Sequence, residues 1–371
     1  MNFFEILGSS LPSVITLSVV FLFGCIGETI SEKAGNLNLG IPGVMCFGVV
    51  GGGIGSLIYM NFIYPAMPVT ANAFGFIELI SYILLVLLGI VFSFAFGAIG
   101  GLIYSFLTTT LKANQNVTGL ALTTFGAGVG DFFMTLMRRD DGDGLFEVAA
   151  KIYGTHLTNA TLGAAGTTFD NSNWHMGFIA SDNAIANIFS QPSLVYICFI
   201  LAIVVFIVLN KTRIGLSLRA VGENPATADA AGINTDKYKY MATIIGCGIA
   251  GIGGVFYNMI RLQGGWNGTG NLQNLGWMVL ALVIFTVWNP LIAIAGSLVF
   301  AFLYSIPSYI NADMVTGKFL VLIPYIMTVV VLIFTSILGK KNVLPPGSLG
   351  VNYFREVVRR NVGCHSYCDT V

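Results

Sequence analysis

Polar side chains that are suited to binding a ligand interrupt the apolar runs of this chain at two places. The stretch Gly27–Gly43 carries the carboxylates Glu28 and Glu32 and the amides Asn36 and Asn38. Amides both donate and accept hydrogen bonds, which suits an uncharged polar ligand. The glycines and the proline of this stretch permit a break in a helix. The stretch is either a tight loop between two helices or a re-entrant segment that lines a binding site.

A second group of amides and hydroxyls opens a later apolar run. It consists of Asn114, Gln115, Asn116 and Thr118. Residues of this kind also start helices well, so a capping role and a ligand-binding role both remain open. Asp131, near the other end of the same run, is the only carboxylate that we place inside a span, where its burial would be costly.

Motifs for catalysis and cofactor binding are incomplete. The run 246–251 matches G-x-G-x-x-G but lies inside an apolar stretch without a preceding strand, so we assign its glycines to helix packing. The Gly-Lys pairs at 317–318 and 339–340 lack the rest of a phosphate-binding loop. The tail stretch Cys364-His-Ser-Tyr-Cys368 would need a fourth ligand to bind a metal. We predict no catalytic residue, no metal site and no cofactor bound by this chain.

The composition sets the environment of these residues. Of 371 residues, 17 are Lys or Arg and 17 are Asp or Glu, together 9%, while 55% are hydrophobic. Soluble domains carry roughly 25% charged residues, so this chain has too little charge to cover a soluble fold. Its net charge of zero leaves no basic face for nucleic acid. We predict an all-α, polytopic protein whose partner is the lipid bilayer.

About nine apolar runs, with a range of about eight to ten, are candidates for crossing the bilayer, and some are short enough to be broken or re-entrant. They are 11–27, 41–60, 77–107, 117–137, 194–209, 240–259, 275–288, 291–310 and 319–338. The run 77–107 is too long for one untilted span, so it tilts, protrudes or contains a break.

The basic residues predict the orientation. With the N-terminus outside, 12 of the 17 Lys and Arg residues lie on the inner side and 5 on the outer side, as the positive-inside rule requires. The transmembrane domain is then 1–340, with an outer segment at 138–191 and an inner loop at 210–239. A cytoplasmic tail follows at 341–371.

The inner loop contains a short helix with both ends marked. Asn224 is a good N-cap, Pro225 fits the first helical position, and Gly232 suits the left-handed residue after the last turn. The alanines between them, Ala228 included, let a partner approach closely. The helix is either an ordinary surface helix or a contact for a cytoplasmic motor.

Several stretches resemble one known family. Arg219-Ala-Val-Gly-Glu-Asn-Pro-Ala, followed by Ala230-Ala-Gly-Ile, resembles the cytoplasmic coupling loop of permease subunits of bacterial ABC importers for nucleosides and simple sugars. Stretches that resemble the nucleoside-type permeases follow in the family's order over most of the chain, at 27–43, 116–122, 288–290, 323–328 and 349–356.

The resemblance implies a multi-pass subunit of the bacterial cytoplasmic membrane that forms the path of a nucleoside or related solute. A simple sugar or riboflavin is the alternative solute, and a stand-alone channel or ion-coupled transporter is the alternative mechanism. The implied partners are a separate ATPase that uses ATP, a second permease subunit in a heterodimer, and an extracytoplasmic binding protein. The chain itself is then a transport subunit and not an enzyme.

The resemblance also implies which residues do this work. Those that contact the ATPase are Arg219, Gly222, Glu223, Asn224, Pro225, Ala228 and Gly232. Those that line the solute path are Glu28, Glu32, Asn36, Asn38, Asn116 and Thr118, with the three asparagines facing one cavity.

Two departures from the family's pattern bear on the solute and on docking of the outer partner. Thr286 and Val287 stand where relatives carry Gly-Lys, directly before Trp-Asn-Pro. The outer segment 138–191, with its acidic Asp-Asp-Gly-Asp-Gly, is unlike that of the usual relative.

Overall fold

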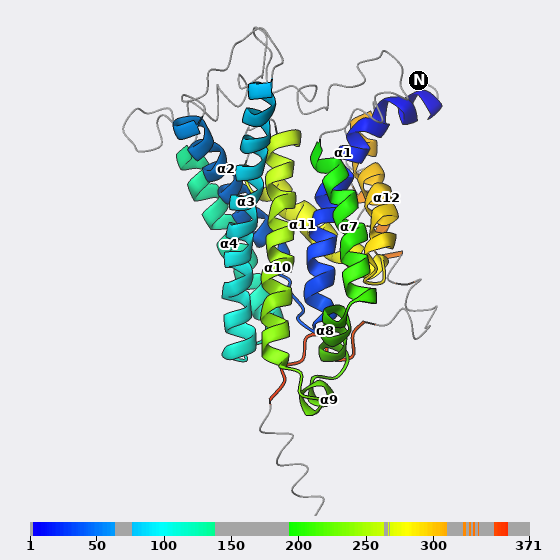
Figure 1. The fold of residues 1–371 in the computed structure, drawn as a ribbon. Helices are drawn as coiled ribbons and strands as arrows, with labels where there is room; N and C mark the ends of the chain where they lie inside the picture. The colour runs from blue at the N-terminus through cyan, green and yellow to red at the C-terminus, as the bar shows by residue number, and fades with distance from the viewer. Residues whose placement is uncertain are drawn as a thin grey trace, which may run out of the picture.

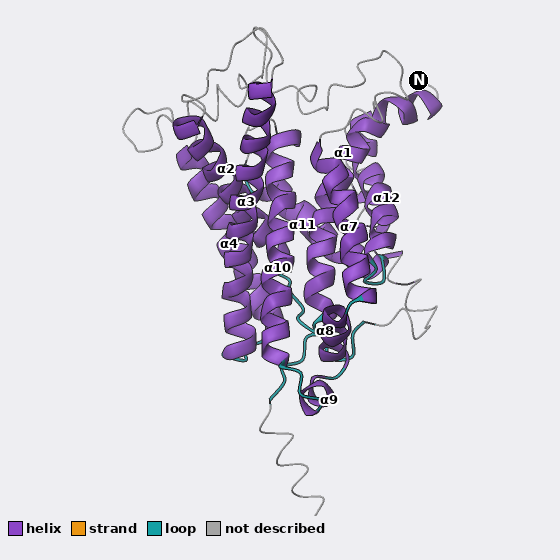
Figure 2. Cartoon of the chain, viewed as in Figure 1, coloured by secondary structure: helices purple, strands orange, loops and turns teal. Residues whose placement is uncertain are grey.

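The computed structural model describes residues 3–63, 76–137, 193–262, 266, 268–309 and 345–354, with seven further positions between 322 and 333. These residues form helices joined by short loops, and none of the described residues is in a strand (Figure 2). The all-α prediction is therefore confirmed for this part of the chain. The outer segment 138–191 and the cysteines Cys364 and Cys368 lie outside the described residues.

Among the residues that the structure describes, ten α-helices have defined bounds, and three π-helical turns extend α2, α3 and α10. The α-helices are α1 (Phe3–Lys33), α2 (Ile41–Ile58), α3 (Phe76–Ser105), α4 (Gln115–Met137), α7 (Ser193–Lys211), α8 (Arg213–Glu223), α9 (Pro225–Ala230), α10 (Thr235–Phe256), α11 (Gly270–Phe285) and α12 (Pro290–Tyr309). The π-helical turns are η1 (Tyr59–Ile63), η3 (Phe106–Thr110) and η6 (Tyr257–Arg261).

Seven of the described helices are long and apolar enough to cross a membrane, and α11 is a shorter apolar helix of 16 residues. The long run 77–107 is one continuous helix with no break, so α3 accommodates its length by tilting or protruding (Figure 1). The first span ends later than the sequence predicted, at Lys33 and not at Gly27. Of the expected span 319–338 only a few positions are described, and these are helical.

The helices form a buried centre and an outer ring. In the 18-residue apolar stretch of each span, 89% of the residues of α1 and α2 and 78% of those of α10 are buried, whereas α3, α4, α7 and α12 have 28–39% buried. The exposed side chains of the ring are large and apolar, for example Val91, Phe132 and Ile200. Such a surface is stable against lipid and not against water.

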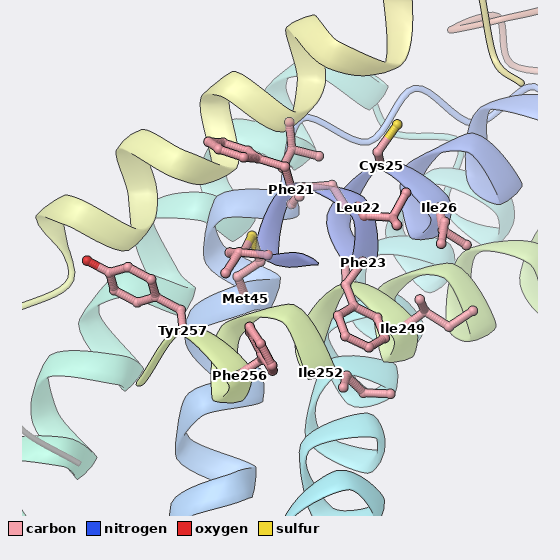
Figure 3. Packing of buried hydrophobic residues seen from close by; sticks show 14 of the residues in the cluster. Phe21, Leu22, Phe23, Cys25, Ile26, Met45, Ile249, Ile252, Phe256 and Tyr257 are labelled. Atoms are coloured by element: carbon pink, nitrogen blue, oxygen red, sulfur yellow. The ribbon is translucent and has the colours of Figure 1, made fainter. Parts of the chain in front are cut away.

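The centre is packed from bulky side chains of α1, α2 and α10 (Figure 3). Phe23 of α1 faces Phe256 of α10 with ring centroids 6.5 Å apart, and Met45 of α2 is fully buried beside them. Glycines let the helix backbones touch. A Cβ atom on Gly27 would lie 2.2 Å from the Gly246 carbonyl oxygen, closer than atoms can approach. The assignment of the glycines near 246 to helix packing is confirmed.

One end of the bundle gathers the short helices and the basic residues. In Figure 1, α8 and α9 lie at the lower end, where α1, α3 and α7 end and α4 and α10 begin. The described basic residues at this end are Lys33, Lys112, Lys211, Arg213, Arg219, Lys237 and Lys239. Arg261 lies at the opposite end of α10, where it donates a hydrogen bond to Ser13 near the start of α1 (2.8 Å). By the positive-inside rule the lower end is the inner end.

Candidate solute path and inner coupling surface

Residues 34–40, which join α1 to α2, form a buried, non-helical turn that we call the re-entrant segment. Gly35 has φ +86°, a conformation that glycine adopts without strain, and begins the turn. The Tyr104 hydroxyl donates to the Leu37 carbonyl oxygen (2.5 Å), and Thr123 donates to that of Leu39 (2.8 Å). Side chains of α3 and α4 thus satisfy backbone groups that no helix satisfies, as a membrane interior requires.

The two amides of the segment bind α10. Asn36 Nδ2 donates to Thr243 Oγ1 (2.8 Å) and to the Lys239 carbonyl oxygen (3.4 Å), while Asn38 Nδ2 contacts Cys247 Sγ (3.2 Å). Both side chains are buried. The amides therefore hold the segment to the central helix of the bundle.

The two carboxylates lie one helical turn apart in the buried part of α1. Glu28 Oε1 accepts the backbone N–H of Asn38 (3.1 Å), and Glu32 Oε2 accepts the indole N–H of Trp288. The prediction that Asp131 is the only carboxylate within a span is wrong. The polar residues after Gly27 looked like a loop, but α1 continues through them and the surrounding helices bury them.

Two acceptor atoms beside the segment lack a hydrogen-bond donor within the described structure. They are Asn36 Oδ1 and Glu28 Oε2, and both are buried. A buried acceptor without a donor is uncommon and marks a place where a bound molecule or water would be stabilised.

Residues at the start of α4 divide between two faces. Gln115 is buried, and its Oε1 accepts the backbone N–H of Leu37 (2.7 Å), while Thr118 is buried nearby on the same face. Asn116 is exposed, and its own N–H is bound by Asn114 Oδ1 (3.0 Å). Successive residues of a helix are rotated by about 100°, so Asn116 points away from Asn36 and Asn38. The prediction that Asn116 faces the same cavity as these two residues is therefore wrong, and Gln115 is the amide that faces the segment.

Asp131 anchors the start of α11. Its carboxylate accepts three hydrogen bonds, from Trp266 Nε1 (3.2 Å), the Thr269 backbone N–H (2.9 Å) and the Thr269 hydroxyl (2.8 Å). Thr269 is the N-cap position of α11 and makes no cap hydrogen bond of its own. Asp131 therefore connects α4 to α11, and these hydrogen bonds offset the cost of partly burying its carboxylate.

The short helix α9 has the predicted ends. Asn224 Oδ1 accepts the Thr227 backbone N–H (3.1 Å), Pro225 is the first helical residue, and Gly232 has φ +82°. Ala228 faces the protein and is only 3% exposed. The face of α9 that is open to a partner carries Thr227 and Ala230 instead.

The preceding helix α8 fixes α9 to the end of α1. A Cβ atom on Gly222 would lie 2.2 Å from the Lys33 carbonyl oxygen, so only glycine permits this contact. Glu223 Oε2 accepts the backbone N–H of Gly347 (3.2 Å), and Arg219 Nη1 donates to Asn210 Oδ1 (3.4 Å). Gly222 and Glu223 thus pack α8 against other segments of the same chain.

The turn between α11 and α12 is strained. Val287 and Trp288 have φ +54° and +51°, a region that β-branched and bulky residues rarely adopt. The Trp288 indole at this turn is the group that binds Glu32. The departure from the family at Thr286 and Val287 therefore lies directly beside a buried carboxylate of α1.

Sequence reasoning missed three of the contacts that build this region. Tyr104 and Thr243 are single polar residues in long apolar helices and carry no local signal. Trp288 belongs to the Trp-Asn-Pro stretch that resembles the family, but its partner Glu32 lies 256 residues away in the chain.

Comparison with known proteins gives a family match and several relatives. Residues 10–334 match the family described as branched-chain amino acid transport system / permease component. The chain is 29% identical to a putative glucose ABC transporter permease of Haloferax volcanii, over 79% of this chain and 75% of that protein. It is 27% identical to a nucleoside ABC transporter permease of Lactococcus lactis and 24% identical to a guanosine ABC transporter permease of Bacillus subtilis, each over 96% of this chain and 99% of the relative.

No solved structure matches the chain. The family match covers most of the chain, and the spanning helices agree with it. The chain belongs to the branched-chain amino acid transport system / permease component family, and it is a multi-pass permease subunit of an ABC importer in the cytoplasmic membrane.

Proposed function

We propose that this subunit conducts a nucleoside, and that the re-entrant segment 34–40 forms part of the solute's path. The observation that supports this best is two buried acceptor atoms without a donor among the described residues, Asn36 Oδ1 in the amide-rich segment and Glu28 Oε2 in the adjoining helix α1. The ribose hydroxyls and base amino groups of a nucleoside are donors that such acceptors bind.

The relatives favour a nucleoside over a sugar. Of three relatives that are named for nucleosides or guanosine, two align with 96% of this chain, whereas the third covers 81% of it and the one named for glucose covers 79%. A sugar also supplies hydroxyl donors, so it is the second candidate solute.

The same proposal includes the partners of the subunit. ATP is bound and hydrolysed by a separate ATPase that docks on the open face of α9, and a second, different permease completes the path. An extracytoplasmic binding protein delivers the solute. Support for two permeases comes from Lactococcus lactis, which has relatives named as two nucleoside permeases that both resemble this chain.

Uptake by the complete transporter in vesicles tests the proposal. We expect labelled adenosine, guanosine or uridine to accumulate when ATP is supplied on the ATPase side. Excess unlabelled nucleoside should compete with this uptake, and excess glucose, riboflavin or leucine should not. Accumulation of glucose without accumulation of any nucleoside would overturn the proposal.

A matched pair of variants tests the path. Asn36→Ala removes a buried amide of the re-entrant segment, whereas Asn116→Ala removes an exposed amide at the start of α4. We expect Asn36→Ala to raise the KM for uptake and Asn116→Ala to leave it unchanged. Equal effects of the two substitutions would contradict the place of segment 34–40 in the path.

A further inference from the structure

The segment Pro346–Tyr353, which we call the C-terminal strap, crosses the inner end of the bundle. It belongs to the predicted cytoplasmic tail 341–371, but in the structure it packs against four separate parts of the chain. These are the end of α8, the re-entrant segment, the start of α4 and α9. No motif in the sequence indicated these contacts.

The strap first closes the end of α8. The Ser348 backbone N–H and hydroxyl both donate to the Gly222 carbonyl oxygen (2.9 and 2.6 Å), and the Gly347 N–H donates to Glu223 (3.2 Å). The last carbonyl groups of a helix have no partner within the helix. The strap supplies donors to this helix end.

The strap next reaches the re-entrant segment by two routes. The Gly350 N–H donates to the Gly35 carbonyl oxygen (3.3 Å). Asn352 Oδ1 accepts from Gln115 Nε2 (3.2 Å), and Gln115 Oε1 in turn accepts the Leu37 backbone N–H (2.7 Å). Asn352 Nδ2 also donates to the carbonyl oxygens of Lys112 and Ala113 (2.8 and 3.0 Å), so all of its amide groups are used.

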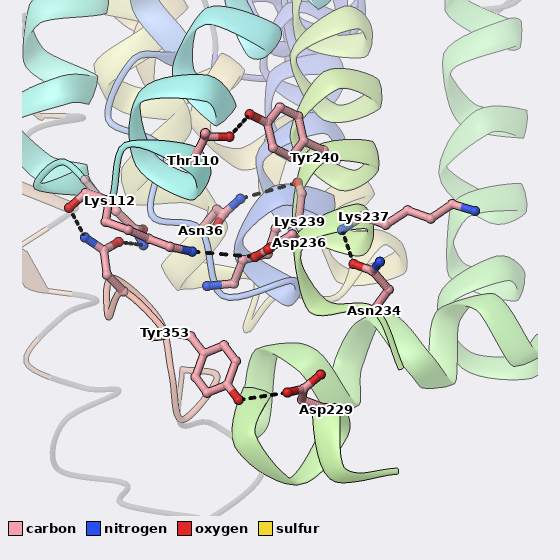
Figure 4. A network of polar contacts seen from close by, with 12 residues as sticks. Asn36, Thr110, Lys112, Asp229, Asn234, Asp236, Lys237, Lys239, Tyr240 and Tyr353 are labelled. Carbon is pink, nitrogen blue, oxygen red and sulfur yellow. Dashed lines mark hydrogen bonds and ion pairs between the residues drawn. The ribbon is translucent and has the colours of Figure 1, made fainter. Parts of the chain in front are cut away.

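The far end of the strap holds α9. The Tyr353 hydroxyl donates to Asp229 Oδ2 (3.1 Å), and Figure 4 shows the tyrosine lying beside the short helix. Asn352 and Tyr353 are neighbours in the chain. Three hydrogen bonds and the peptide link between Asn352 and Tyr353 therefore connect α9, through Gln115, to Leu37 of the re-entrant segment.

We propose that the C-terminal strap couples movement of α9 to the re-entrant segment, with Asn352 and Tyr353 as positioning residues. The inference rests on the proposed function in one respect, the docking of an ATPase on α9. A displacement of α9 stretches or breaks the Tyr353–Asp229 bond unless the strap follows. The Asn352 amide is hydrogen-bonded through both its oxygen and its nitrogen. The strap therefore cannot follow α9 without moving Gln115 and Leu37 as well.

The test measures whether ATP binding changes the surroundings of the re-entrant segment. Leu39 is half-buried in this segment and is replaced by cysteine in a chain that carries Cys364→Ser and Cys368→Ser, while the remaining cysteines are buried. In the assembled transporter we expect ATP with vanadate to change the rate at which this cysteine reacts with a small polar thiol reagent. This readout needs no knowledge of the transported solute.

Two strap variants decide the outcome. Tyr353→Phe removes only the hydroxyl that binds Asp229, and Asn352→Ala removes the amide. We expect each to reduce the ATP-dependent change in rate by about fivefold or more, the lower end of typical coupling between sites, while ATP hydrolysis in the absence of solute stays at the wild-type level. If Asn352→Ala does not assemble, Tyr353→Phe decides alone.

Tyr240→Phe is the matched control. It removes a hydroxyl at the same end of the bundle, the one bound to Thr110 (2.5 Å), which lies outside the series of bonds from α9 to Leu37 (Figure 4). We expect it to respond to ATP as wild type does. A full response in Tyr353→Phe, or no response to ATP in the wild-type transporter, would overturn the inference. Failure of the nucleoside proposal alone would appear only in the uptake assay.

Discussion

Glu28 and Glu32 each bind a connecting segment to α1, Glu28 one that lies 10 residues away in the chain and Glu32 one that lies 256 residues away. Glu28 holds the backbone of Asn38 and Glu32 holds the indole of Trp288, so each carboxylate accepts a hydrogen bond from a different connecting segment. Carboxylates buried in a membrane span commonly bind transported ions. Their contacts in this chain indicate that they act as hydrogen-bond acceptors, a role that an uncharged amide oxygen also fills.

This interpretation predicts how substitutions differ. Glu32→Gln keeps the acceptor oxygen that the Trp288 indole needs, so we expect ATP-driven uptake close to that of wild type. In Glu28→Gln one oxygen still accepts the Asn38 N–H, but the unpartnered Oε2 becomes a donor, so we expect a raised KM for uptake. Glu28→Ala and Glu32→Ala leave a buried N–H without its partner, which costs about 1–3 kcal/mol, and we expect a lower unfolding temperature and weaker uptake. Loss of uptake in Glu32→Gln, to the level of Glu32→Ala, would show that the charge of Glu32 itself is required.

Residues whose role is local were predictable, and residues whose role depends on distant partners were not. Asn224 caps α9 by accepting the backbone N–H of Thr227, three residues further along the chain. The sequence identifies this cap because the asparagine, the proline and the final glycine lie within nine residues of one another. The choice between Gln115 and Asn116 depends on the rotation of α4 against α1 and α2. Nothing within the amide-rich stretch itself fixes that rotation.

Close backbone contact is the feature that holds the helices together. The spacing of glycines predicted such contact for α10. The backbone of α4 touches that of α2 in the same way, since a Cβ atom on Gly126 would lie 2.4 Å from the Gly43 carbonyl oxygen. The helix bounds were harder to predict. The polar residues between Gly27 and Lys33 resemble a loop in sequence, and only their burial by neighbouring helices explains why α1 includes them.

Two glycines of α4 give a matched test of this packing. Gly126→Ala forces a methyl group into the backbone of α2, so we expect a loss of about 1–3 kcal/mol in the free energy of unfolding. Gly128 has no atom within 4 Å of the added methyl, so Gly128→Ala should be neutral or stabilising by up to about 1 kcal/mol. Thermal unfolding in detergent measures both, and equal effects would contradict the packing role of Gly126.

The whole molecule has two unlike ends. The described part of the inner end is a surface made by α8, α9, the turn between α3 and α4, and the C-terminal strap, and hydrogen bonds hold these segments together (Figure 1). The sequence predicted the side on which this surface lies, because the basic residues are unevenly distributed. It did not predict that the strap joins the surface, because those contacts connect segments more than 120 residues apart.

Cysteine substitutions on α9 test both the sidedness and the docking face. Ala230 is exposed on α9 and Ala228 is buried, although they are two residues apart in one helix. We expect Ala230→Cys to react with a thiol reagent in inverted vesicles, to remain unlabelled by a membrane-impermeant reagent in intact cells, and to crosslink to the ATPase. Ala228→Cys should do none of these, because its side chain faces the protein. Labelling of Ala230→Cys from outside intact cells would show that the chain has the opposite orientation. Crosslinking from Ala228→Cys but not from Ala230→Cys would place the ATPase on the opposite face of α9, where the contacts of α9 with α8 and the strap would have to open.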